Sequence, residues 1–216
     1  MNALKKFFHG MTIIMLVAII LSTHPASAQN TGMWGQLSGN SLGGGVSSTP
    51  VSGFSTSRGL GLGLKIGGEI KYNDFEGVSW FGGLDQNSRR LHLTGRNLGD
   101  VDSTTFSGGL QYRFEGSGAF KPFVRGGINY TTFDGGSLGN NTLRIEDSGN
   151  LGAKAEIGGM FLLDKTSLKN DIINTAGFSF GKDWHRKVEL RTNAGARVSD
   201  LNFDGTYFKV WVGKSW

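Results

Sequence analysis

Strict alternation of apolar and polar residues is the main pattern of this chain, and Leu60–Tyr72 (LGLGLKIGGEIKY) shows it most clearly. Mostly apolar side chains and a terminal aromatic occupy the even positions, whereas glycines and the charges of Lys65, Glu69 and Lys71 occupy the odd ones. A period of two residues places alternate side chains on opposite faces of a β-strand. The segment therefore predicts a two-faced strand, about as long as the ~9–11 residues that cross a bilayer.

The same alternation recurs along the chain and predicts seven further strands. These are Gly32–Gly39, Glu76–Leu84, Ser103–Phe114, Phe120–Phe133, Leu151–Leu163, His185–Ser199 and Thr206–Trp216. An even number of antiparallel strands can close on itself with both termini at the same side, and a closed sheet has no unpaired edge. The prediction is therefore an all-β fold, a transmembrane antiparallel β-barrel of eight strands.

Two further features place this barrel in an outer membrane. Aromatic residues end the apolar faces of several strands, as in the girdles of membrane barrels: Tyr72, Tyr112, Phe114, Phe208 and Trp216. Short connections alternate with long ones, which is typical of tight periplasmic turns and long outer loops. The tight turns are 73–75 and 115–119, and the long loops are 40–59, 85–101 and 134–148.

One segment does not fit the count of eight. Asp171–Gly181 (DIINTAGFSFG) also alternates, and a ninth strand would leave one terminus outside. We interpret it as a long inner connection or an accessory hairpin. The alternative is a ten-stranded barrel that also recruits Arg89–Gly95 as a strand.

The first 28 residues predict a cleaved secretory signal. Lys5 and Lys6 precede the apolar run Met11–Leu21, and Ala26-Ser27-Ala28 is a small-residue cleavage site. The mature protein would then be a barrel domain over residues 29–216, with its formal net charge lowered from +5 to +3.

Composition excludes several other classes of function. The chain has no cysteine, so it has no disulfide framework or thiol chemistry. Its pI near 9.5 could suggest nucleic acid, but the basic residues are spread over many strands, and we expect no nucleic-acid partner. The predicted mature chain has only His92 and His185, and no motif joins them to Ser79, Ser107 or Glu189. We expect no enzymatic activity, metal or cofactor.

Assigning faces by alternation gives the side chains that point into the barrel. The predicted charge layer comprises Lys65, Glu69, Arg113, Arg125, Lys154, Glu156, Glu189 and Arg191, with Lys71, Lys187, Arg197 and Lys209 on the same faces. The predicted ligand path consists of the inward aromatics Phe81, Phe133, Tyr207 and Trp211, mostly near the outer strand ends. Two interpretations remain open: a lumen plugged by bridged charges, or an apolar outer vestibule above a charged layer.

The stretch PFVRGGINYTTF (Pro122–Phe133) resembles a strand of the OmpW family of small outer-membrane barrels. The following strand, NLGAKAEIGGMFLL (Asn150–Leu163), is similar to the family's next strand. The resemblance spans roughly residues 71–163 and the last strand. It implies an eight-stranded barrel that passes small hydrophobic molecules across the outer membrane, with release sideways into the bilayer as one route.

The sequence departs from that family in two places. Its last residue is Trp216 where the family has Phe, with Lys214 in place of an aromatic, and the 164–184 connection is longer than the family's tight turn. The expected partners are outer-membrane lipid, small hydrophobic molecules, and the barrel-assembly machinery through the strand ending at Trp216. Arg58, Arg89, Arg90 and Arg96 are candidates for contact with lipopolysaccharide phosphates, or are simply solvated loop residues.

Overall fold

The computed structural model describes residues 32–43, 46–70, 77–115, 118–134, 138–140, 142–146, 149–163 and 173–215. The predicted signal, Lys71 and Tyr72, and the terminal Trp216 lie outside the described residues. The described part of the chain forms thirteen strands, and none of it is a helix long and apolar enough to cross a membrane.

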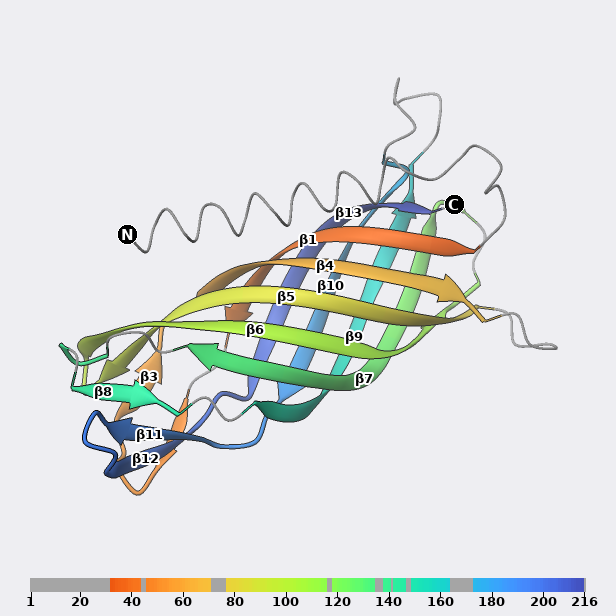
Figure 1. The fold of residues 1–216 in the computed structure, drawn as a ribbon. Helices are drawn as coiled ribbons and strands as arrows, with labels where there is room; N and C mark the ends of the chain where they lie inside the picture. The colour runs from red at the N-terminus through yellow and green to blue at the C-terminus, as the bar shows by residue number, and fades with distance from the viewer. Residues whose placement is uncertain are drawn as a thin grey trace.

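Eight strands form a closed antiparallel barrel, as predicted (Figure 1). They are β1 (Met33–Gly43), β4 (Gly59–Glu69), β5 (Val78–Leu93), β6 (Arg96–Arg113), β7 (Phe120–Asp134), β9 (Asn150–Leu162), β10 (Thr175–Trp184) and β13 (Gly205–Ser215). The order around the barrel is β5-β4-β1-β13-β10-β9-β7-β6, and pairing of β5 with β6 closes it. We call the end that holds Met33 and Ser215 the inner end, and the opposite end the outer end.

The alternation of each strand separates the barrel's two faces. On β4, Leu60 is 73% exposed on the outside, whereas Lys65 is 3% exposed on the inside. The same outward exposure is found for large apolar residues on the neighbouring strands, among them Phe106, Leu110, Ile128, Leu151, Ile157, Phe180 and Val210. An apolar outer belt around a polar interior is the arrangement that a lipid-facing barrel needs.

A second, four-stranded sheet lies at the outer end, and we call it the cap sheet (Figure 1). Its strands, in order, are β2 (Ser47–Thr49), β12 (Arg197–Asn202), β11 (Val188–Thr192) and β8 (Leu143–Ile145). They come from the connections β1–β4, β7–β9 and β10–β13. The short strand β3 (Phe54–Thr56) pairs with the outer end of β5.

The seventh barrel strand differs from the prediction. It is β10, which overlaps Asp171–Gly181, the segment that the sequence analysis predicts as an inner connection or accessory hairpin. His185–Ser199, which we predicted as that strand, instead supplies β11, a turn with Gly195 at φ 91°, and the start of β12. Both segments alternate, but only β10 has inward glycines: a Cβ on Gly177 or Gly181 would overlap the rings of Trp211 and Tyr207, respectively.

The predicted outer loop 85–101 is also wrong, because β5 and β6 continue through it as a paired hairpin. Thr94 and Gly95, with φ of 48° and 81°, make its turn. Arg89–Gly95 therefore extends existing strands, and the ten-stranded alternative fails. We call Arg89–Val101 the outer hairpin.

The cap sheet and the outer hairpin enclose an apolar core. This cap core consists of Val46, Phe54, Leu91, Val101, Phe133, Leu138, Ile145, Val188, Leu190, Leu201 and Phe203. Five of these side chains are 0–1% exposed on β5, β6, β11 and β12, namely Leu91, Val101, Val188, Leu190 and Leu201. Burial of this apolar surface holds the cap sheet against the end of the barrel.

Candidate functional site

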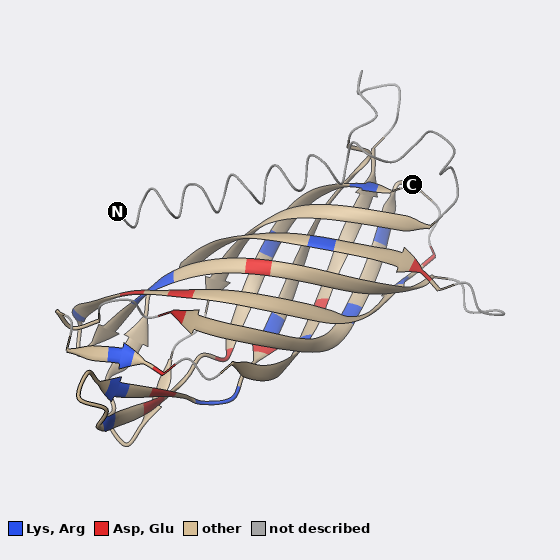
Figure 2. Ribbon diagram, viewed as in Figure 1, with Lys and Arg blue, Asp and Glu red and all other residues tan. Residues whose placement is uncertain are grey.

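The middle of the barrel interior is a layer of buried charge. We call Lys65, Asp85, Arg125, Lys154, Glu156 and Lys209 the charged layer. Each is at most 4% exposed, and charged residues appear on several strands at this level in Figure 2. Charges in such a position must pair or meet water, because burying an isolated ion is costly.

Glu156 is the hub of one half of this layer. Its carboxylate accepts hydrogen bonds from Lys65 Nζ at 2.7 Å and Arg125 Nη1 at 2.8 Å, and from the Tyr207 hydroxyl at 3.0 Å. Arg125 also donates to Gln36 at 3.0 Å. These contacts cross the lumen from β9 to β4, β7, β13 and β1, so they close it at this level.

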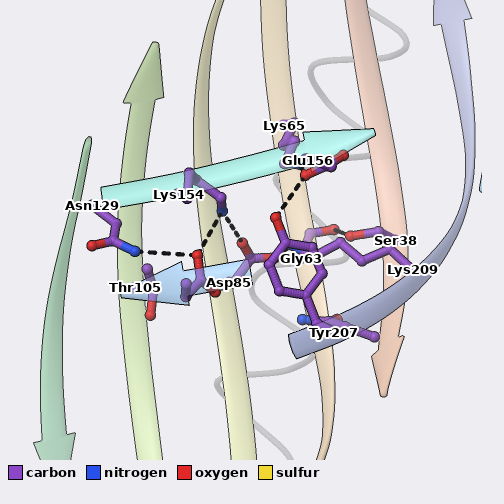
Figure 3. A network of polar contacts seen from close by, with 12 residues as sticks. Ser38, Gly63, Lys65, Asp85, Thr105, Asn129, Lys154, Glu156, Tyr207 and Lys209 are labelled. Carbon is purple, nitrogen blue, oxygen red and sulfur yellow. Dashed lines mark hydrogen bonds and ion pairs between the residues drawn. The ribbon is translucent and has the colours of Figure 1, made fainter. Parts of the chain in front are cut away.

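Asp85 organises the other half (Figure 3). Lys209 Nζ donates to its Oδ1 at 2.7 Å. Lys154 Nζ lies 3.7 Å from Asp85 Oδ2 and 3.8 Å from Asp183 Oδ1 but makes no hydrogen bond. Asn129 donates to the same Asp183 oxygen at 3.2 Å.

Aromatic side chains fill the lumen on the inner side of the charged layer. Phe123, Met160 and Trp211 pack as a buried cluster. The Arg125 guanidinium lies 4.3 Å from the centroid of Phe123 and 5.1 Å from that of Trp34, distances at which a cation is attracted to an aromatic face. The two layers together leave the barrel interior filled rather than open.

The outer side of the charged layer adjoins the cap core. The rings of Phe133 and Phe203 stack at 4.7 Å, and His185 meets Phe133 edge-on at 6.0 Å. His185 lies beyond the end of β10, where burial lowers its pKa. Its backbone N–H donates to Asp204 at 2.6 Å.

The four inward aromatics of the predicted ligand path are all 3–4% exposed, but they do not gather at the outer end. Phe133 and Tyr207 lie in the outer half of their strands, whereas Phe81 and Trp211 lie in the inner half. The predicted path is therefore interrupted, because the charged layer, to which the Tyr207 hydroxyl bonds, lies between Phe133 and the inner pair.

The predicted charge layer is also divided. Lys65, Arg125, Lys154 and Glu156 lie in the lumen as placed by alternation. Glu69 and Arg113 form a 2.7 Å ion pair near the inner end, each about one-third exposed.

Glu189 and Arg191 are outside the barrel, on β11, and this part of the prediction is wrong. They pair with each other at 2.6 Å, and the hydrogen bond from Arg191 lowers the pKa of Glu189. Lys187 and Arg197 leave the lumen for the same reason, since the segment that carries them belongs to the cap.

Sequence reasoning missed three charged groups of this region. Asp85 lies on the same, inward face of its strand as Phe81, but it is the first residue of the predicted loop 85–101. The sequence also gives no lumen role to Asp183 and Arg89, because both lie in segments predicted as connections that are in fact parts of barrel strands. Continuing the alternation of β5 past Leu84 finds Asp85 and Arg89, whereas Asp183 follows only once Asp171–Gly181 is assigned to the barrel wall.

Arg89 is not a candidate for contact with lipopolysaccharide, because its side chain points inward and the residue is only 8% exposed. Arg58, Arg90 and Arg96 are exposed at the outer end. Their contact with lipopolysaccharide stays a prediction.

A sequence profile of outer membrane protein β-barrel domains matches residues 13–172. The chain belongs to the outer membrane protein β-barrel domain family. No curated protein matches the sequence. The family and the fold together place the protein in the bacterial outer membrane, so the outer belt faces lipid and the cap faces the exterior.

Solved structures share this fold at low sequence identity. The outer membrane protein OprG from Pseudomonas aeruginosa superposes with a TM-score of 0.61 and 18% identity, over 86% of this chain and 96% of that one. The outer membrane protein AlkL, solved in lipid bilayers, gives 0.53 and 15% over 90% and 96%. Neisserial surface protein A gives 0.52 and 13% over 86% and 97%. The fold is therefore the small OmpW-like barrel that the strand motifs indicated.

Proposed function

We propose that this barrel passes small hydrophobic molecules from the exterior into the outer membrane. The observation that carries the proposal is the order of the layers along the barrel axis: the apolar cap core lies directly on the outer side of the charged layer. A small apolar molecule is favoured in the first environment and disfavoured in the second.

The charged layer also indicates the route by which a ligand would leave the cap core. The hydrogen bonds at Glu156 span the lumen, and the aromatic cluster lies beneath them. A molecule that reaches the cap core would therefore leave sideways into lipid rather than continue along the barrel axis. Access from outside would require the cap sheet to open, and β2 and β12, which come from different connections of the barrel and pair over only three residues, are where it can part.

A second candidate is a purely structural barrel with no transport. The filled lumen favours it, because a barrel whose interior is bridged from wall to wall needs no ligand to be complete. The two candidates differ in what the cap does, so the cap is the part to test.

The test uses a disulfide that locks the cap sheet. Thr49 and Asp200 are direct antiparallel partners on β2 and β12, and such partners have the Cα separation that a disulfide requires. The described residues contain no cysteine, nor does the sequence, so the T49C/D200C pair would be the sole thiol pair. The readout is the rate at which the apolar dye N-phenyl-1-naphthylamine becomes fluorescent in Gram-negative cells with an intact outer membrane.

We expect the wild-type protein to accelerate dye uptake, the oxidised pair to abolish that acceleration, and reduction to restore it. The reduced variant serves as the matched control, since it carries the same substitutions. Uptake equal to that of cells without the protein would instead favour the structural barrel. Uptake that is unaffected by the lock would rule out access between β2 and β12.

A further inference from the structure

Arg89 is a buried cation without a carboxylate partner. It lies on the inward face of β5, above Asp85, and among the described residues no carboxylate comes within ion-pair distance of its guanidinium. Its Cζ lies 5.3 Å from the centroid of Phe203, so the guanidinium rests on an aromatic ring of the cap core. Asp183 is near enough to act on it electrostatically but not to bond to it.

Lys154, one level deeper, is a second buried cation whose contacts with carboxylates are incomplete. Its side chain is 1% exposed, and its Nζ makes no hydrogen bond, with the nearest carboxylate oxygens at 3.7 and 3.8 Å. Close to Lys154, the Asn129 side chain donates a hydrogen bond to the same Asp183 oxygen that Lys154 approaches. Asn129 is the cross-strand partner of Ser107, whose hydroxyl is buried and makes no hydrogen bond. Figure 3 shows Lys154 between Asp85 and Asn129.

The interior as a whole carries excess positive charge. Among the described residues, five basic side chains are buried there against the carboxylates of Asp85, Glu156 and the partly buried Asp183. The basic groups are Lys65, Arg89, Arg125, Lys154 and Lys209. Lys65, Arg125 and Lys209 donate hydrogen bonds to their carboxylates, whereas Lys154 has only two longer ion pairs, with carboxylates that other groups also bind, and Arg89 has none. The excess positive charge therefore lies around Arg89 and Lys154. Buried charges of this kind require a counter-charge or water.

We propose that Arg89 and Lys154 form a binding site for the anionic head group, of the carboxylate type, of a small amphiphile. Arg89 meets the carboxylate first, since a guanidinium offers paired donors that match it. Lys154 faces it from the charged layer. The apolar part of the ligand lies among Phe133, Phe203 and their neighbours in the cap core. This inference rests on the proposed function and narrows its substrate class to anionic amphiphiles.

The experiment compares probes that differ only in the head group. Binding of radiolabelled decanoate, decan-1-ol and decyltrimethylammonium is measured by equilibrium dialysis with the full protein in lipid nanodiscs, and binding to empty nanodiscs is subtracted. We expect decanoate to bind about tenfold or more tightly than decan-1-ol, as hydrogen bonds to two charged donors allow, and the cation to bind least.

The matched variants are R89Q and R90Q. The two arginines are neighbours on β5, but Arg90 points outward and pairs with Asp100 at 3.5 Å. R89Q should remove most of the preference for decanoate, R89K should keep part of it, and R90Q should leave it unchanged. K154M should lower decanoate binding without weakening that of decan-1-ol.

Several results would overturn the site. Equal binding of decanoate and decan-1-ol to the wild-type protein would by itself reject the site. That result is expected if water, rather than a carboxylate, compensates Lys154 and Arg89. Equal loss in R89Q and R90Q would reduce the effect to overall surface charge. If decan-1-ol binds while decanoate has no advantage, the proposed function stands and this site fails; if none of the probes binds, both fail.

Discussion

The membrane-spanning barrel and the cap are built from the same alternating strands, but their polarity is opposite. In the barrel, Leu60 faces outward and Lys65 inward. In the outer hairpin, Arg90 faces outward and Leu91 is fully buried. The strand pattern is therefore the same in both, and the surroundings decide which face is apolar: lipid outside the barrel, and water outside the cap.

The two regions are stabilised by different interactions as a result. The barrel interior depends on ion pairs and hydrogen bonds around Glu156 and Asp85, whereas the cap depends on apolar burial. A substitution that damages one region should therefore leave the other largely intact.

The largest effect is expected from E156Q. It removes the carboxylate that pairs Lys65 with Arg125 and leaves buried charge uncompensated, which costs about 3–5 kcal/mol when one partner of a buried pair is lost. Urea unfolding of the barrel in lipid vesicles measures it. The control is E69Q, which loses a partly exposed pair worth about 0–1 kcal/mol. Equal losses in the two variants would mean that the charged layer does not stabilise the barrel.

L190A should destabilise the cap by about 2–5 kcal/mol, because it empties a fully buried position in the cap core. Hydrogen exchange should become faster in β2, β8, β11 and β12 and stay unchanged in the lipid-facing part of β4. L60A, at an exposed position of the outer belt, is the control. Loss of protection throughout the barrel would contradict the independence of the two regions.

G181A tests the assignment of β10 to the barrel wall. A Cβ there would overlap the Tyr207 ring, and overpacking of this kind costs about 1–3 kcal/mol. The control is G82A, because nothing lies within 4 Å of a Cβ built on Gly82. Unfolding in urea distinguishes them, and equal stability of the two variants would show that Gly181 does not face the ring.

The smallest effect concerns pH and His185. Burial lowers its pKa below the ordinary 6.5, so the closed cap favours the neutral imidazole, whereas an opened cap binds the proton more readily. The stability of the closed cap should therefore be complete above the ordinary pKa and decrease as the pH falls below about 6.5. Hydrogen exchange of the cap sheet measured at pH 5 and pH 8 should show this dependence. H185Q should lose it, and a wild type without it would contradict the placement of His185.

The contrast between barrel and cap also explains how far the sequence could be interpreted. The described part of Leu60–Tyr72 was assigned correctly, because its apolar face is the lipid-facing one. His185–Ser199 alternates equally well, but its apolar face is buried in the cap, and alternation alone cannot distinguish these cases. The Asn193-Ala-Gly195 run within it is a turn signal that outweighs the alternation. Pairings such as Asp85 with Lys209, 124 residues apart, depend on barrel closure and have no local signal.

We expect the charged layer and the aromatic cluster to close the lumen, so that no aqueous path follows the barrel axis. Single-channel recording of the purified protein in planar bilayers tests it most directly. Stably inserted wild-type protein should give no steady conductance steps, both with and without a reducing agent and in the locked T49C/D200C variant. Regular ohmic steps that persist when the cap is locked would contradict the account, because they would require an open channel past Glu156 and Trp211.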